Sequence, residues 1–296
     1  MEGVMTLEQL RIFISVAERE HMTAAARALN ITQSTASAAI SALEERHGVK
    51  LFHRVGRGIT LTEAGKIFLD EARRVLAQAT TAETVLDELS GLRRGTLRVV
   101  ASQTIAAYWL PPALVTFRRE FPDIEVVLEI GNTRQVAAHV RDGKSDLGIV
   151  EGKVDDPALA HWPIGEDRLE LVQAAPFDEG STIDAAWLQS ARWIMRERGS
   201  GTRSSLDGCL RKVGVQPETL EEFLVLPSNE SVRTAVEAGV GIAALSSLVV
   251  APALAAGTLH VAPLDFGPRI FSGLRHKERY RSKAADALLQ VIETTR

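Results

Sequence analysis

The stretch from Thr23 to Glu45, TAAARALNITQSTASAAISALEE, constrains the fold of this chain more than any other. Two short helical patterns, Thr23 to Leu29 and Gln33 to Glu45, flank the polar connection Asn30-Ile31-Thr32. Two helices joined by so short a turn form a helix-turn-helix. Thr32 also stands where its hydroxyl can cap the free amides of the second helix. The stretch therefore predicts a helical hairpin with a sharp turn.

The second helix has one apolar and one polar side. Its apolar residues recur at spacings of four and three, as one stripe of a 3.6-residue period: Ala36, Ile40 and Leu43. Amide and hydroxyl side chains fall toward the other side, and such groups hydrogen-bond base edges and phosphates when a helix end enters a major groove. Alanine-rich hairpins with polar faces also occur in plain bundles, so this stretch alone favours DNA binding only slightly.

The residues that follow strengthen the DNA-binding interpretation. Gly48 ends the helix, and a basic tip with Arg54, Arg57 and Gly58 precedes the run Ile59 to Thr62. A basic, glycine-containing hairpin after a helix-turn-helix is typical of a wing. We therefore expect DNA contacts from Thr23, Thr32, Gln33, Ser34, Thr35, Ser37, Ser41, Lys50, Arg54 and Arg57.

Residues 7–66 resemble the winged helix-turn-helix of LysR-type transcriptional regulators. The rest of the chain follows that family in order and length, so the resemblance covers essentially all 296 residues. The sequence departs from the family at His21-Met22, where a Gly-Ser type turn is more usual, and at Ser246, where a proline usually follows the apolar strand. The matching positions are the alanines 24–26, Leu29, Gln33, Ser37, Leu43, Glu44, Gly48, Leu51-Phe52, Arg54, Leu61-Thr62 and Ala64-Gly65.

Length and composition set outer bounds. A chain of 296 residues predicts two or three domains. The single cysteine, Cys209, excludes an internal disulfide and a cysteine-built metal site. The N-terminus lacks the pattern of a signal peptide, and the most apolar run, Val240 to Ala256, is too short to span a bilayer. We therefore expect a cytoplasmic protein with no membrane partner.

The net charge of −4 conceals a division along the chain. Residues 1–66 carry eight basic and seven acidic side chains, which leaves −5 for the remainder. The DNA-binding part is therefore only weakly basic. We expect folding to concentrate its positive charge near Lys50, Arg54 and Arg57, and we expect a dimer to supply two such domains.

A long helical pattern after the wing predicts a dimerisation helix, residues 67–92. Its apolar positions alternate spacings of four and three over three heptads: Phe68, Ala72, Val75, Ala79, Ala82, Leu86 and Leu89. The seam would span about 30 Å at 1.5 Å per residue, close to one turn of DNA. The resemblance implies that two such helices pack antiparallel. The alternative is an amphipathic helix lying on its own domain. Residues 93–96 are expected to form a hinge.

Beyond the hinge, strands and helices alternate, which predicts an α/β fold after the all-α, winged N-terminal domain. One long helix is expected from Thr104 to Phe121. The resemblance implies an effector domain like that of periplasmic binding proteins, with two lobes joined by two strands that cross near residues 165 and 267. Subdomain I then comprises residues 97–166 and 267–296, and subdomain II comprises residues 167–266.

Polar residues follow several of the predicted strands, where a two-lobed α/β fold places its ligand. Convergent helix N-termini favour an anion such as a carboxylate or an inorganic anion. The family's effector contacts fall on positions matching Ser102, Thr104, Thr133 and Thr202, and the GSGT motif at 199–202 is most similar to a branch associated with sulfur or inorganic-anion metabolism. Arg203 either pairs with such an anion or is a surface arginine. The predicted effector residues are Ser102, Gln103, Thr104, Thr133, Glu151, Ser200, Gly201, Thr202, Arg203, Asn229 and Ser231.

No pattern in the sequence predicts catalysis, a cofactor or a metal. The run Gly239 to Ala244 fits a relaxed GxGxxA, but it leads from a helix into a strand, the reverse of a dinucleotide fingerprint. We therefore expect a regulator controlled by a small effector, binding double-stranded operator DNA as a homodimer or homotetramer, with RNA polymerase as a further partner. The alternatives are a solute-binding protein of the transport type and a regulator whose cleft is vestigial.

Overall fold

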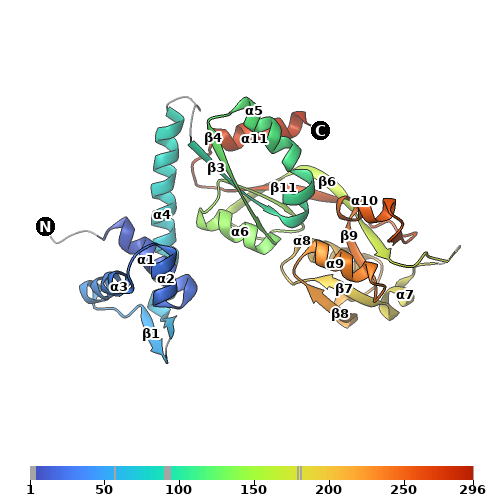
Figure 1. Ribbon diagram of the computed structural model, residues 1–296, viewed down its shortest axis with the longest axis horizontal. Coiled ribbons are helices and arrows are strands. Elements are labelled where there is room, and N and C mark those ends of the chain that lie inside the picture. Colours follow the sequence, from blue (N-terminus) through green and yellow to red (C-terminus); the bar gives the residue numbers. More distant parts are fainter. Residues whose placement is uncertain (1–4, 57, 90–94, 179, 181, 296) are drawn as a thin grey trace. The chain divides into compact units, whose positions relative to one another are not determined.

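The computed structural model describes residues 5–56, 58–89, 95–178, 180 and 182–295 (Figure 1). The chain forms two compact units, Met1–Leu86 and Asp87–Arg296. Arg57 and residues 93–94 of the predicted hinge, residues 93–96, lie outside the described residues, as do the side chains of residues 87–89, which include the predicted dimerisation residue Leu89. The first unit is called the head below.

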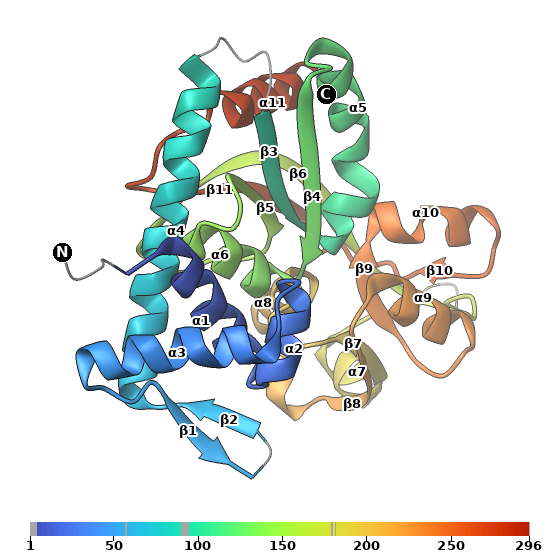
Figure 2. The ribbon, with the colours of Figure 1, turned by 60° about the vertical axis from the view of Figure 1, so that its left-hand side comes forward.

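The head is a small helical domain with a two-stranded hairpin that projects next to its third helix (Figure 2). Phe13 is completely buried at its centre, with its ring centroid 5.4 Å from that of Phe52 and 4.7 Å from that of Phe68. The elements are α1 (Leu7–Arg19), α2 (Met22–Ala28), α3 (Gln33–His47), β1 (Phe52–Val55), β2 (Gly58–Leu61) and α4 (Glu63–Leu89).

The predicted helix-turn-helix is α2 and α3. Thr32 caps α3 as expected, because its hydroxyl accepts a hydrogen bond from the Thr35 amide at 3.1 Å. Asn30 adopts the left-handed conformation, φ 55°, that the tight turn requires. His21 caps α2 through Nδ1, which accepts from the Ala24 amide at 3.3 Å. This departure from the family pattern therefore preserves the function of a helix cap.

α4 begins at Glu63, four residues before the predicted dimerisation helix of residues 67–92. Phe68 and Ala72 pack into the core of the head, so they do not belong to an exposed seam. They were predicted to line the dimerisation seam, and their packing in the head was not expected, because α4 is both the last helix of the head and the start of the linker. Dimerisation stays a prediction for Val75 and Leu86, which are 44% and 69% exposed, and for the smaller Ala79 and Ala82.

A buried carboxylate joins α3 to the wing. Glu44 accepts hydrogen bonds from the Leu51 amide at 2.8 Å, the Phe52 amide at 3.2 Å and Lys50 Nζ at 2.7 Å. Burial alone would raise the pKa of Glu44, but these three donors outweigh burial and hold that pKa below its ordinary value of 4.5. Ionised Glu44 therefore fixes the start of the wing relative to α3.

Glu44→Gln should lower the free energy of unfolding of the head by about 1 to 3 kcal/mol at neutral pH, since a charge-assisted network is lost. Because the folded pKa is depressed, this contribution is present above the unfolded pKa and disappears as the pH falls through the folded value. Urea unfolding followed by far-UV circular dichroism should thus show a difference from wild type that shrinks below pH 4.5. Glu45→Gln, at an exposed neighbour, is the control; a pH-independent difference would contradict the assignment.

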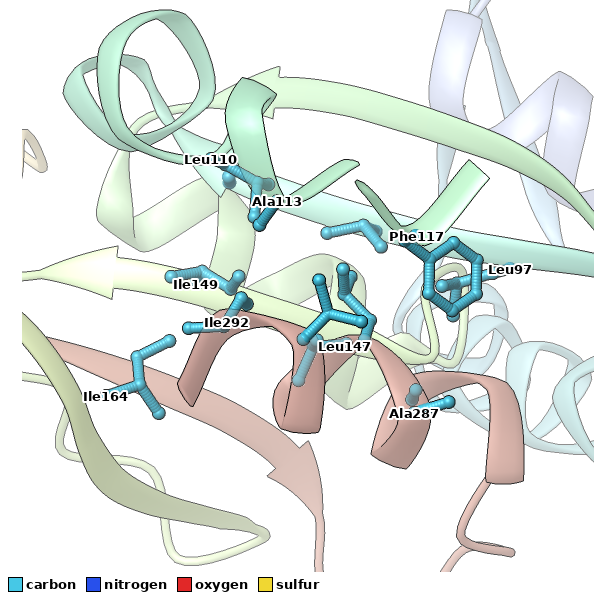
Figure 3. Close-up of a cluster of buried hydrophobic side chains, with 14 of the residues drawn as sticks. Leu97, Leu110, Ala113, Phe117, Leu147, Ile149, Ile164, Ala287 and Ile292 are labelled. Carbon is cyan, nitrogen blue, oxygen red and sulfur yellow. The ribbon is translucent and has the colours of Figure 1, made fainter. Parts of the chain in front are cut away.

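The second unit has two lobes. Lobe I holds a sheet in the order β6-β11-β5-β3-β4, in which β3 is parallel to β4 and β5. α5 and α11 cover one face of this sheet, and Figure 3 shows Phe117 of α5 and Ile292 of α11 in that core. α6 covers the other face. Its elements are β3 (Gly95–Ser102), the π-helix η1 (Ile105–Trp109), α5 (Pro111–Glu120), β4 (Ile124–Gly131), α6 (Thr133–Asp142), β5 (Leu147–Glu151), β11 (Pro268–His276) and α11 (Lys283–Thr294).

The single helix expected from Thr104 to Phe121 is instead η1 followed by α5. Pro111 has no amide hydrogen to donate, so it stands at the first position of α5 and interrupts the hydrogen-bond ladder.

Lobe II is a second α/β layer, with α7 and α8 on one face and α9 and α10 on the other. The strand β6 belongs to both lobes, because residues 159–168 pair with β11 and residues 169–173 pair with β9 and β10. The helices α7 and α10 were not anticipated; α10 forms the second half of the apolar run Val240 to Ala256. The elements are β6 (Leu159–Gln173), α7 (Ala185–Ser190), β7 (Arg192–Arg196), α8 (Gly201–Lys212), η2 (Pro217–Thr219), β8 (Glu221–Leu226), α9 (Asn229–Glu237), β9 (Ala243–Ser246), α10 (Ser247–Ala255) and β10 (His260–Val261).

Candidate DNA-binding and effector sites

The exposed surface of α3 carries the polar side chains predicted to contact DNA. Ala36, Ile40 and Leu43 are buried in the head, so the apolar stripe lies inward as expected. Several predicted contact residues on α2 and α3 are exposed, namely Thr23, Gln33, Ser34, Thr35 and Ser41, and Ser37 is half-buried. The Thr32 hydroxyl is hydrogen-bonded to the hydroxyls of Ser34 and Thr35, with oxygen–oxygen distances of 2.8 Å in both cases. Its structural role is therefore that of a helix cap.

The wing supplies positive charge near this helix. Arg54 is exposed on β1, where it pairs in register with Ile59 of β2. The side chain of Lys50 is 75% exposed although its ammonium group bonds Glu44. Part of the Lys50 charge is therefore compensated within the head, whereas no ion pair of Arg54 occurs among the residues that the structure describes.

The predicted effector residues meet around the carboxylate of Glu151, which is 2% exposed at the end of β5. Ser102 of β3 donates its hydroxyl to Glu151 Oε2 in a short hydrogen bond. Thr202 of α8 lies with its hydroxyl 3.5 Å from Glu151 Oε1. Thr133 of α6 donates to the Glu151 carbonyl at 2.7 Å. One acidic residue thus connects two strand ends and two helix N-termini drawn from both lobes.

The lobes are in direct contact at this cluster. A Cβ on Gly201 would overlap the Glu151 carbonyl oxygen and the Thr133 hydroxyl, so only glycine fits at the start of α8. Close by, Asn229 of α9 donates its side-chain amide to the Thr104 hydroxyl at 3.0 Å, and its backbone amide donates to Gln103 Oε1 at 3.0 Å. Thr104 and Asn229 are almost fully buried.

Three of the predicted effector residues have other roles. Arg203 is 5% exposed, and it bonds Asp207 at 3.0 Å and Glu222 at 2.5 Å, so its charge is compensated within lobe II. Ser200 caps α8, and the Ser231 hydroxyl donates back to the Ser228 carbonyl in the first turn of α9. Arg203 is therefore not a surface arginine, and its contact with an effector anion stays a prediction.

The most complete ion pair beside the cluster was not predicted. Arg269 of β11 faces Asp167 of β6 in register, and its Nε and Nη2 donate to the two Asp167 oxygens at 2.7 and 2.5 Å. The third nitrogen, Nη1, donates to the Thr202 hydroxyl at 3.2 Å. Both side chains are at most 5% exposed. The pair therefore lies where the chain passes between the lobes and is tied to Thr202.

Ser246 completes the surroundings of this pair. Its hydroxyl donates to Asp167 Oδ2 at 2.5 Å and accepts from the Leu248 amide at 3.1 Å, which caps α10. A proline at this position would supply neither bond. The departure of Ser246 from the family pattern was therefore the signal in the sequence that a specific polar contact lies here.

A second set of bonds joins the lobes through Glu197. Its Oε1 accepts from the Asn132 side-chain amide of lobe I at 3.1 Å and from Arg196 Nη2 at 3.0 Å. Arg196 is 4% exposed and also donates to Asn229 Oδ1 at 2.5 Å. No group of three or more histidine, cysteine or acidic side chains within the described ranges could hold a metal ion.

The sequence also matches known families over nearly its whole length. Residues 7–66 match the family described as "Bacterial regulatory helix-turn-helix protein, lysR family". Residues 90–296 match the "LysR substrate binding domain". The chain belongs to the LysR family. It is accordingly a DNA-binding transcriptional regulator with a substrate-binding domain.

Relatives and solved structures agree with this family assignment. The chain is 33% identical over 294 residues to a probable RuBisCO transcriptional regulator of Trichormus variabilis, covering 97% of this chain and 87% of that one. It is 34% identical over 293 residues to the uncharacterized HTH-type transcriptional regulator YeiE of Escherichia coli, covering 98% and 97%.

Among solved structures, a full-length OxyR variant of Pseudomonas aeruginosa has a TM-score of 0.66 at 24% identity, covering 98% of both chains. The LysR family regulator CbnR has a TM-score of 0.67 at 21% identity, covering 98% of this chain and 99% of that one. At these identities the likeness concerns the fold. Among the residues described here, no helix is long and apolar enough to cross a membrane.

Asp167→Asn should destabilise this LysR-family substrate-binding domain by about 3 to 5 kcal/mol, because Arg269 would keep a buried charge without its partner. All four tryptophans, at 109, 162, 187 and 193, lie in this unit, so urea unfolding followed by tryptophan fluorescence reports on it alone. The control is Asp265→Asn, which removes the exposed pair with Arg168 at 3.6 Å and should cost less than about 1 kcal/mol. Equal effects of the two variants would show that burial of the pair is unimportant.

Proposed function

We propose that this LysR-family regulator is controlled by a small effector that binds between lobes I and II, at the cluster around Glu151. The observation that carries the proposal is the set of hydroxyls from both lobes, Ser102, Thr133 and Thr202, gathered on one buried acidic residue. A ligand that takes over these donors must alter interlobe bonds. Such a ligand would bind one arrangement of the two lobes more tightly than another, and this difference in affinity is what ligand control of the regulator requires.

An anionic effector fits this site best. The cluster already stabilises a buried carboxylate, so the same hydroxyls suit the carboxylate or inorganic anion of an effector. The N-termini of α6, α8 and α9 also lie here, and their dipoles favour negative charge. Because Glu151 uses two of the donors, an entering anion has to displace its side chain. An anion therefore displaces the Glu151 side chain only if it accepts more hydrogen bonds from these residues than Glu151 does.

A second candidate is a regulator with a vestigial cleft. The tight contact at Gly201 and the mutual hydrogen bonds of Thr104 and Asn229 favour it, since these groups are satisfied without a ligand. The transport-type alternative is disfavoured by the family assignment, which includes the DNA-binding domain.

The proposed assembly is a homodimer or homotetramer that binds double-stranded operator DNA and contacts RNA polymerase. The exposed apolar residues Val75 and Leu86 of α4 support self-association. The structure of CbnR with its target DNA supports DNA binding by this fold, because it covers 99% of this chain at a TM-score of 0.66. We propose that the protein has no enzymatic activity, needs no cofactor and acts in the cytoplasm.

Gln33→Ala should relax discrimination between operator and random DNA by about 1 to 3 kcal/mol, the value of a lost bidentate base contact. Arg54→Ala should instead weaken both DNAs to the same extent and reduce the salt slope by about 1, because a phosphate contact releases counterions. Fluorescence anisotropy at several salt concentrations distinguishes the two effects. If Gln33→Ala weakened both DNAs equally, Gln33 would not read bases.

Thermal melting against small anions, from sulfate and phosphate to aliphatic and aromatic carboxylates, tests the effector site. A ligand at about a hundred times its Kd adds about 2.7 kcal/mol, which corresponds to a rise in melting temperature of about 5 to 11 °C for a unit of this size. Thr202→Val should abolish the shift, whereas Thr219→Val, at an exposed position, should not. A shift that survives Thr202→Val would place the ligand elsewhere, and a silent panel would favour the vestigial cleft.

A further inference from the structure

A groove of about 370 Å³ lies along one side of α8. Its lining comes from both lobes: Lys153 follows β5 of lobe I, Ser204, Gly208 and Lys212 belong to α8, and Phe266 and Ile270 flank the start of β11. Its volume is within the range of small-molecule sites. Of the effector cluster and its ion pair, only Arg269 borders the groove, so this is a separate space.

The groove has an excess of positive charge. Lys153 and Lys212 are exposed, and within the described residues neither forms an ion pair, while the groove lining contains no carboxylate. The charge of Arg269 is already matched by Asp167. Two lysines without an ion-pair partner therefore leave the groove lining with a positive charge that an anion would neutralise.

Part of the remaining wall is apolar. Phe266 is half-buried and Ile270 is 46% exposed, although removing an isoleucine side chain from water is favourable. Leu169 and Pro268 extend this surface. A fully hydrated inorganic anion would leave the apolar wall uncovered. A ligand with an apolar body would cover that wall and still present its charge to the lysines.

We propose that this groove binds a small carboxylate with an apolar body, which packs on Phe266 and Ile270 while its charge lies between Lys153 and Lys212. Because the two lysines belong to different lobes, such a ligand holds lobes I and II together from outside the Glu151 cluster. It is therefore a second regulatory site, independent of the effector site proposed above.

The test uses the full-length protein and 2-naphthoate as the probe. Cys209 lines the groove and is the only cysteine in the chain, so its alkylation by iodoacetamide reports on this position alone. Burial raises the pKa of the Cys209 thiol, so the reaction is run at alkaline pH. We expect 2-naphthoate to slow alkylation and to bind measurably in calorimetry. Neutral 2-naphthalenemethanol and inorganic phosphate should do neither, because the alcohol has no negative charge and phosphate has no apolar body.

The variants locate the probe. Lys153→Gln and Lys212→Gln should each weaken 2-naphthoate about tenfold, the loss expected for one charged contact. Gly208→Glu should abolish binding, since its side chain enters open space in the groove and stands four residues before Lys212. Glutamate is also a better helix former than glycine, so α8 should remain folded. Lys283→Gln, an exposed lysine on α11, is the charge-matched control.

Two outcomes would overturn the proposal. One is the absence of millimolar binding and of Cys209 protection. The other is binding that survives Gly208→Glu but is lost in Thr202→Val, which would place the probe in the cleft. The Thr202→Val variant should otherwise bind 2-naphthoate normally, so failure of this inference and failure of the proposed effector site are distinguishable.

Discussion

The buried ion pair between Asp167 and Arg269 is the interaction on which the two-lobed unit depends. The residues face each other across β6 and β11, where the chain passes between the lobes. A buried charge is costly unless its partners are complete. Here both Asp167 oxygens are bonded, and Arg269 uses Nε, Nη1 and Nη2. The ion pair therefore fixes the geometry of the crossing strands together with the backbone hydrogen bonds between β6 and β11.

From this pair, hydrogen bonds continue into the candidate effector site. Thr202 accepts from Arg269 and lies within reach of Glu151, whose second oxygen accepts from Ser102. A ligand that takes Thr202 or Ser102 as a donor thus changes the surroundings of Glu151 in lobe I and of Arg269 at the crossing. In the proposed function, ligand binding and lobe arrangement use the same hydrogen bonds, and this sharing would couple them.

The head and the cluster around Glu151 were predictable from sequence because their signals are local. Thr32 precedes the helix it caps, and Ser102 and Thr133 follow or open the elements that present them. Asp167 and Arg269 are 102 residues apart, and neither stands in a motif, so only the fold brings them together. The burial of Phe68 and Arg203 was not predicted, for a related reason. Periodicity shows which face of a helix is apolar, and a motif shows where a charged residue stands. Neither shows which part of the fold will bury that face or that charge.

The DNA-binding part of the head carries little net positive charge, which bears on the proposed assembly. Residues 1–66 have a net charge of only +1, and the ammonium group of Lys50 bonds Glu44. Phosphate contacts supply most of the affinity of such domains, so a single head binds DNA weakly. Joining two heads through α4 makes the second contact intramolecular and raises its effective concentration. If the exposed Val75 and Leu86 on α4 join two heads as proposed, their contribution to DNA affinity is comparable to that of the predicted base-contacting residues of α3.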